Sequence, residues 1–272
     1  MEQSEFRLES GRKAVWGMIH LGPLPGTPFY REGSFDMLRE TAVESAVALQ
    51  RGGADGCLVQ SVDRVYSTED ESDPARTTAI ALIVDAIVRA SGHDARFHVG
   101  VQLMRNALTA SLAVAKVAGG SFIRAGAVVG MTLSPHGMVE AQPLALAEYR
   151  RKIDALGIGV VADVDSMHFQ WFGGGKSTGE VARAARNVGA DAVALSDPNE
   201  GRALEKIASV RRSAPGLPVI LAGHTNHSNA ERLLAAADGA FVGTCLEEAG
   251  WGGRIDIDKV RAYVDIARSV ES

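Results

Sequence analysis

Residues 217–244, LPVILAGHTNHSNAERLLAAADGAFVGT, decide the fold, because they read as strand, loop, helix, strand and loop. An apolar run at 217–222 ends at Gly223, and a second run at 240–242 ends at Gly243. The last units of a (β/α)8 barrel have this form, and their loops often bind a phosphate group. The stretch therefore predicts a barrel whose other units can be counted backwards from it.

The loops of this stretch also contain candidate phosphate ligands. Backbone N–H groups that follow a glycine, next to a short helix expected at 245–249, form a typical anion site. Ser228 and Glu231 have the spacing of a capping box and predict the start of the helix between the two strands. The candidate phosphate-binding residues are Gly223, Thr225, Gly243 and Thr244.

The rest of the chain alternates short apolar runs with segments of helical periodicity. Strands are expected at 14–21, 55–61, 97–103, 121–124, 158–164, 191–195, 217–222 and 240–242. This alternation predicts an α/β fold, a (β/α)8 TIM barrel that occupies 14–272 as one domain after a polar segment at 1–13. A doubly wound open sheet is the alternative, but no dinucleotide-binding fingerprint follows the first strand.

Two long loops interrupt this alternation. The segment 125–142 has no clear periodicity and is expected to be a loop. The loop at 165–176 contains Trp171 and a glycine run, and it predicts a mobile lid over the mouth of the barrel.

Composition excludes several classes of protein. The chain has 272 residues and a net charge of -5, which gives no basic surface for nucleic acid. No apolar run approaches the roughly 20 residues that a membrane-spanning helix needs. The polar start of the chain lacks an apolar signal core, which predicts a cytoplasmic protein. Cys57 and Cys245 are expected to be small hydrophobic residues and not a disulfide framework.

With the units placed, five segments resemble the BtpA/SgcQ family, and the similarity extends over most of 14–270. The segments are GMIHLGPLPGTP at 17–28, QLMRNAL at 102–108, FIRAGAVVGM at 122–131, ADVDSMH at 162–168 and ADGAFVGTCL at 237–246. The resemblance implies a (β/α)8 barrel related to phosphate-binding barrels. One branch of the family is described as a photosystem I biogenesis factor, and another as nucleosidase-like enzymes.

The chain departs from the family pattern at expected strand ends. The second strand ends in residues 60–64, QSVDR, where the family has a Glu-Asn-Phe-Gly-Asp word. Other departures are Gln102 for Asn, Ala107 for Asp, Gly126 for Asn, Asp165 for His, Met167 for Lys and His224 for an apolar residue. Because barrel chemistry takes place at strand ends, the chain is expected to be a divergent branch with an altered substrate or reaction.

Asp163 and Asp165 are the first candidate catalytic residues, because they lie two apart at the end of the fifth expected strand. Residues two apart on a strand point the same way, and neighbouring carboxylates shift each other's pKa, which suits acid/base work at a glycosidic bond. The alternative is a structural role, for instance an ion pair between Asp163 and Arg124.

His20 is the third candidate catalytic residue, because it ends the first strand within the segment most specific to the family. Histidines and carboxylates at the mouth also form a candidate metal set, comprising His20, Asp163, Asp165, His168 and His224. No HxH or HExxH spacing is present, so the sequence assigns no metal ligand and no cofactor, and a divalent metal stays an alternative.

Polar side chains at the remaining strand ends are candidates for substrate binding. Amides and an arginine at these positions suit sugar hydroxyls, a nucleobase or a phosphate. The candidate substrate-binding residues are Gln60, Gln102, Arg124, His168, Asp197 and His224.

Three functions follow from these residues and from the resemblance. The first is an enzyme with a phosphorylated sugar or nucleoside-like substrate, which it cleaves or rearranges at the anomeric carbon in a nucleosidase-like reaction. The second is a non-catalytic assembly factor of the photosystem I BtpA type, and the third is a metal-dependent hydrolase or lyase. By analogy with other barrels we expect a homo-oligomer with a small-molecule substrate as its main partner.

Overall fold

Parallel strands close into a barrel in the computed structural model, which describes residues 6, 8–9 and 11–271. The barrel strands are β1 (Ala14–Leu21), β2 (Gly56–Ser61), β3 (His98–Gln102), β4 (Phe122–Ala125), β7 (Gly159–Asp165), β8 (Ala192–Leu195), β9 (Val219–Leu221) and β10 (Gly239–Val242). They follow one another around the barrel in chain order, and β10 pairs with β1 to close it. The predicted (β/α)8 fold is thereby confirmed.

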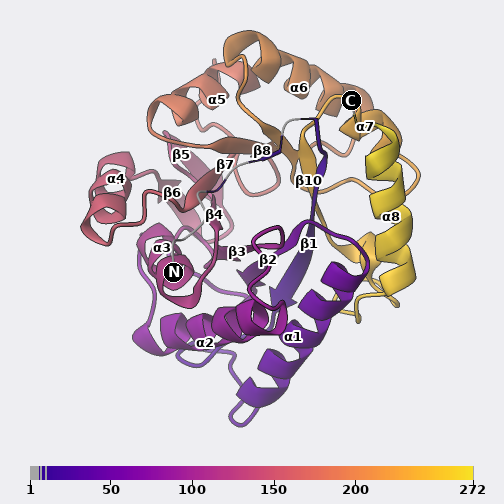
Figure 1. Cartoon of the computed structure of the whole chain (residues 1–272). Helices are drawn as coiled ribbons and strands as arrows, with labels where there is room; N and C mark the ends of the chain where they lie inside the picture. The colour runs from indigo at the N-terminus through magenta and orange to yellow at the C-terminus, as the bar shows by residue number, and fades with distance from the viewer. Residues whose placement is uncertain (1–5, 7, 10, 272) are drawn as a thin grey trace.

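Helices surround the strands, as the outer ring in Figure 1 shows. They are α1 (Phe35–Arg51), α2 (Pro74–Ala90), α3 (Leu108–Ala118), α4 (Pro143–Lys152), α5 (Thr178–Asn187), α6 (Glu200–Ser213), α7 (Ala230–Leu234) and α8 (Ile257–Ser269). The Asp73 side chain caps α2, and Ser177 and Glu180 form a complete capping box at α5. Within the described residues, none of the helices combines the length and apolar character that a membrane span needs.

The core has two layers because side chains alternate along each strand. One set packs between the strands and the surrounding helices and includes Val15, Val59 and Val160. The other set fills the barrel interior and includes Trp16, Phe122 and Phe241, whose rings contact one another. The interior is therefore a packed core, and any ligand must bind at one of its ends.

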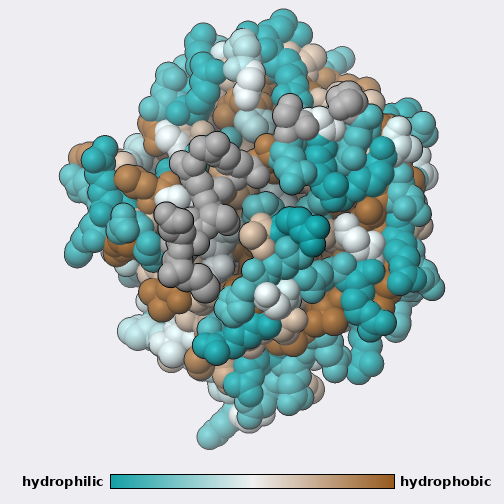
Figure 2. Space-filling model, viewed as in Figure 1, coloured by the Kyte–Doolittle hydropathy of each residue, from teal (hydrophilic) through white to brown (hydrophobic). Residues whose placement is uncertain are grey.

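The described part of segment 1–13 packs against the amino end of this interior. The Phe6 ring lies 6.0 Å from Trp16 and 5.4 Å from Phe122. Gly159 makes room for it, since a Cβ atom there would lie 2.2 Å from the Phe6 ring. Hydrophilic residues cover most of the outer helices on the face shown in Figure 2.

Two local expectations are wrong. The segment 125–142 contains an antiparallel hairpin of β5 (Met131–Ser134) and β6 (Gly137–Glu140). The Ser228 capping box does not form, because α7 begins at Ala230 after Asn229 and no side chain caps it. The Trp171 ring packs against Gly130 at the start of this hairpin.

Candidate functional site

A cavity of about 530 Å³ opens at the carboxyl ends of the barrel strands. The interior alternation that begins with Trp16 and Met18 on β1 brings His20 to the floor of the cavity. Gln60 on β2 and Arg124 on β4 reach the floor in the same way. Of the predicted site residues, the cavity is lined by His20, Gln60, Arg124, His168, Gly223, His224, Thr225, Gly243 and Thr244. The predicted residues that do not line it are Asp163, Asp165, Gln102 and Asp197.

Arg124 on β4 and Asp163 on β7 form a buried, two-pronged ion pair. Nη2 and Nε of Arg124 donate to the Asp163 carboxylate at 2.9 and 3.2 Å. The Arg124 side chain is 3% exposed and that of Asp163 is fully buried, so Asp163 orients the arginine from behind. The Arg124 guanidinium also lies 5.0 Å from the Phe241 ring centroid, which leaves it one face toward the cavity.

Asp165 does not join Asp163, so the expected pair of neighbouring carboxylates is absent at this point of the structure. An irregularity in the β7–β8 pairing between these residues breaks the alternation that the sequence suggests. Asp165 instead accepts hydrogen bonds from Thr178 and Lys206, at 2.7 and 2.8 Å. Each carboxylate therefore has its own cation, Arg124 for Asp163 and Lys206 for Asp165.

Asp197 belongs to the same peripheral cluster. Lys206 lies 3.3 Å from Asp197, and Arg202 donates to it at 3.0 Å. The hydrogen bond from Arg202, together with those from the Asn199 backbone and Lys206, holds the pKa of Asp197 well below its usual range. The cluster fixes the starts of α5 and α6, outside the cavity.

Gln60 and Gln102 form one polar unit. Nε2 of Gln60 donates to Oε1 of Gln102 at 2.6 Å. Gln60 lines the cavity, whereas Gln102 lies behind it and its Nε2 is buried without a partner among the described residues. Gln60 is therefore the amide that can contact a ligand directly.

His20 is the neutral imidazole at the centre of the cavity floor. Burial, and then the charge of Arg124, lower the pKa of His20 to about 4. Its Nδ1 is buried and has no partner within the described chain. At neutral pH His20 is therefore an uncharged imidazole.

Trp251, which the sequence did not indicate, lies over His20. Their ring centroids are 5.8 Å apart, and Trp251 is 64% exposed. Its loop is fastened by a hydrogen bond from Gly253 N to the buried Glu247 carboxylate. The sequence does contain a hint of this role, because Trp251 is an aromatic residue among glycines after the last strand. The glycine run beside Trp171 is the stronger pattern of the same kind, and it drew the prediction to Trp171.

His168 lines the opposite part of the cavity from its place after β7. Its Nδ1 lies 3.0 Å from Nη1 of Arg105, in the loop between β3 and α3. Burial, followed by the charges of Arg124 and Arg105, lowers the pKa of His168 to about 2. Arg105 belongs to the QLMRNAL segment, yet its position beside a histidine 63 residues away could not be seen in the sequence.

The loops after β9 and β10 supply open backbone donors. The N–H groups of Gly223, His224 and Gly243 have no partner within the described residues, and all three residues line the cavity. The expected helix at 245–249 is instead a single 3-10 turn, Thr244–Leu246. The Thr225 hydroxyl is bonded to Tyr263 at 2.6 Å, so only its backbone can serve a ligand.

The residues described do not assemble a metal centre. No three His, Cys, Asp or Glu side chains among them are grouped in a way that could hold a metal ion. Asp163 and Asp165 are engaged by Arg124 and Lys206, as described above. The three histidines line one cavity without being grouped for metal binding, and the two aspartates of the predicted set lie outside it.

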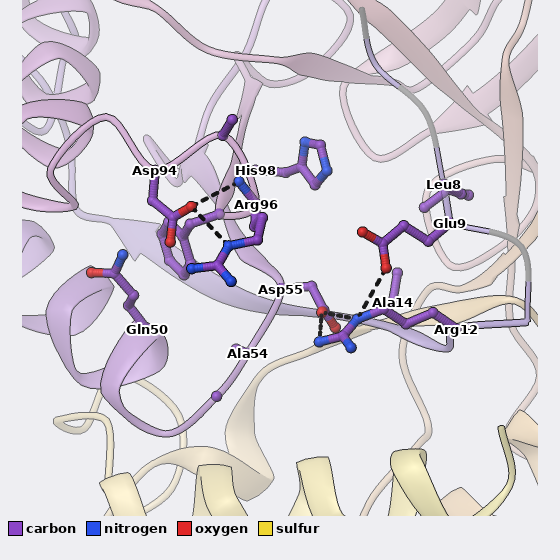
Figure 3. Close-up of a pocket in the computed structure, with 13 residues that line it drawn as sticks. Leu8, Glu9, Arg12, Ala14, Gln50, Ala54, Asp55, Asp94, Arg96 and His98 are labelled. Carbon is purple, nitrogen blue, oxygen red and sulfur yellow. Dashed lines mark hydrogen bonds and ion pairs between the residues drawn. The ribbon is translucent and has the colours of Figure 1, made fainter. Parts of the chain in front are cut away.

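A second cavity, of about 650 Å³, lies at the amino end of the strands. Figure 3 shows that its charged groups pair with one another: Arg12 lies between Glu9 and Asp55, and Arg96 contacts Asp94. Barrel chemistry takes place at the carboxyl ends of strands, whereas residues at the amino end stabilise the fold. We therefore place the candidate site in the smaller cavity.

The closed parallel barrel and its polar cavity at the carboxyl ends of the strands define a protein of the TIM-barrel class. The profile of the BtpA family matches residues 11–269, and the chain belongs to this family.

Two relatives and one solved structure are similar to the chain over most of its length. The photosystem I biogenesis protein BtpA of Synechocystis is 29% identical, covering 96% of this chain and 90% of its own length. An uncharacterized protein of Archaeoglobus fulgidus is 29% identical over 94% of this chain and 99% of its own length. Thiamine phosphate pyrophosphorylase of Pyrococcus furiosus has a TM-score of 0.59 at 17% identity, covering 98% and 100% of the two chains, which indicates a shared fold.

Proposed function

We propose that the protein is an enzyme acting on a small phosphorylated sugar or nucleoside-like metabolite, which it cleaves or rearranges at the anomeric carbon. The observation that carries the proposal is the composition of the cavity at the carboxyl ends of the strands. It combines a fixed cation, Arg124, with two neutral imidazoles and open backbone N–H groups. Such a site suits an anionic ligand that undergoes proton transfer.

The phosphate group would bind at the loops after β9 and β10. The open N–H groups of Gly223, His224 and Gly243 face one cavity, and hydrogen bonds from backbone amides to an anion are strong. Arg124 lines the same cavity, and its Nη1 has no partner within the described residues. The site therefore offers both directional donors and a positive charge.

The chemical roles differ from those that the sequence suggested. His20 is the proton-transfer group, because it is neutral and open to the cavity. Asp163 acts through Arg124, since its carboxylate is fully buried against that guanidinium. Gln60 orients hydroxyl groups of the substrate, and Asp165 holds Lys206 away from the reacting centre.

A binding or assembly role is the second candidate, and one observation favours it. The relative from Synechocystis that is 29% identical is described as a photosystem I biogenesis protein. A protein with that role would need no turnover at the cavity. The metal-dependent reaction receives no such support, because the described side chains form no metal-binding group.

The test is a thermal-shift screen followed by an activity assay. The ligands are ribose 5-phosphate, nucleosides, nucleoside monophosphates and divalent metals, and binding to the native state raises Tm. His20→Asn should abolish release of free sugar or base from a ligand that binds. His93→Asn is the matched control, because His93 is exposed and its positive φ of 53° tolerates asparagine. Binding without turnover in the wild type would favour the assembly role, and undiminished turnover in His20→Asn would reject the role of His20.

A further inference from the structure

The contact between Arg105 and His168 determines which ring nitrogen of the histidine carries the proton. Nη1 of Arg105 lies 3.0 Å from Nδ1 of His168. A guanidinium has only donors and stays charged in proteins, so Nδ1 must accept. In a neutral imidazole the proton then resides on Nε2.

The loop that carries Arg105 is held on both sides of this residue. Arg76 donates to the carbonyl of Met104. Asn106 exchanges two hydrogen bonds with Ala127, at 2.8 and 3.2 Å. The guanidinium is therefore presented to His168 by a fixed backbone.

Protonation of His168 is opposed by everything that faces it. A second proton would place an N–H donor on Nδ1 against the donor of Arg105. Burial is the main cause that lowers the pKa of His168, and the charged and titratable groups around the ring, Arg124, Arg105 and His20, lower it further. The carboxylate of Asp163, which could offset them, is engaged by Arg124.

Nε2 of His168 is the ring atom that remains for a ligand. His168 lines the cavity, and Nε2 has no partner within the described residues. Unlike Nδ1 of His20, it is not among the buried polar atoms without a partner. His20 and His168 are thus distinguished by their surroundings.

We propose that His168 is a permanently neutral Nε2–H donor that binds a substrate oxygen on which negative charge develops. Arg105 is the positioning residue that keeps the proton of His168 on Nε2. The substrate must then present an acceptor oxygen, such as a carbonyl or leaving-group oxygen, next to His168. The substrate part of this proposal rests on the proposed function, whereas the assignment of the proton does not. A neutral imidazole polarises such an oxygen without transferring a proton to it.

The decisive measurement is long-range 1H–15N NMR of the full chain labelled in histidine, with His168 assigned through the signals missing from His168→Gln. We expect the Nε2–H form throughout the range from about pH 8 to pH 5, in which an ordinary histidine titrates. An Nδ1–H form, or a titration within that range, would overturn the proposal. The proton is observed in the wild type, and His168→Gln serves only for the assignment.

Variants of Arg105 test whether this residue holds the proton of His168 on Nε2. Arg105→Met should give a mixture of the two tautomers, because Nδ1 loses its donor, and Arg105→Lys should restore the Nε2–H form because an ammonium also only donates. Arg89→Met, at an exposed site on α2, is the control and should leave the His168 signals unchanged. An unaltered single tautomer in folded Arg105→Met would reject the positioning role.

Ribose 5-phosphate separates this proposal from the proposed function. Its addition should shift the Nε2 signal of His168 in the wild type. A spectrum that shows the Nε2–H form but does not respond to ribose 5-phosphate would reject the phosphorylated-sugar class while it confirms the proton assignment.

Discussion

Asp163 on β7 holds Arg124 on β4 by two hydrogen bonds, of 2.9 and 3.2 Å, inside the barrel and below the cavity floor. Both side chains are almost completely buried. A buried pair of this kind contributes little net stability compared with apolar residues, but it is costly to break. The pair therefore makes a specific prediction about single and double variants.

Asp163→Ala should lower the free energy of unfolding by about 3–5 kcal/mol, because it leaves the Arg124 charge buried and unpaired. The double variant Asp163→Leu with Arg124→Met should regain most of this loss. Urea unfolding measures both effects. Asp258→Ala is the control, since its pair with Arg261 is exposed and is worth less than about 1 kcal/mol. Equal losses at both sites would contradict the argument.

The stability of the protein should fall as the pH drops from about 6.5 toward 4. The pKa of His20 is lowered to about 4 in the folded state, so the unfolded chain binds more protons within this window. The lowered pKa of His20 changes the free energy of unfolding by at most about 3 kcal/mol. This contribution is fully present above the pKa that the histidine has in the unfolded chain, and it is lost as the pH falls below that value. His20→Gln should reduce the slope of the unfolding free energy against pH in this window without abolishing it, because His168, with its pKa lowered to about 2, contributes with the same sign. A curve with the same slope as the wild type would show that another group causes it.

Trp251→Ala should weaken ligand binding about tenfold, since aromatic contacts contribute about 0.5–1.5 kcal/mol beyond burial. The ring lies over His20 and is largely exposed, so the free energy of unfolding should change little. Isothermal titration calorimetry of the wild type and the variant measures the loss. Trp171→Ala is the comparison, because Trp171 packs against Gly130 and should affect stability instead of binding.

Phe6→Ala should destabilise the barrel by up to about 3 kcal/mol, because the partly buried Phe6 ring packs against the amino end of the interior. Gly159→Ala should also destabilise it, since the new Cβ would meet the Phe6 ring. In the double variant the second loss should be much smaller, because the ring is gone. Thermal unfolding of the wild type and the three variants forms a double-mutant cycle, and strict additivity would show that the two residues do not interact.

The sequence by itself determined the barrel, and the reason is that its signals are local. Apolar runs that end at Gly223 and Gly243, and the caps at Asp73 and Ser177, depend on neighbours a few residues apart. The same alternation along the strands correctly brought His20 to the mouth. The hairpin at 131–140 was missed because its short strands give only a weak pattern.

Only the tertiary structure decided how the site works, because its contacts depend on strand register and on loop packing. The irregularity in β7 separates Asp165 from Asp163, which no pattern two residues apart can reveal. Arg105 reaches His168 across 63 residues, and Trp251 reaches His20 from the far end of the chain. Periodicity fixes which elements form, whereas the protonation and charge of the site follow from side chains that meet only when the barrel closes.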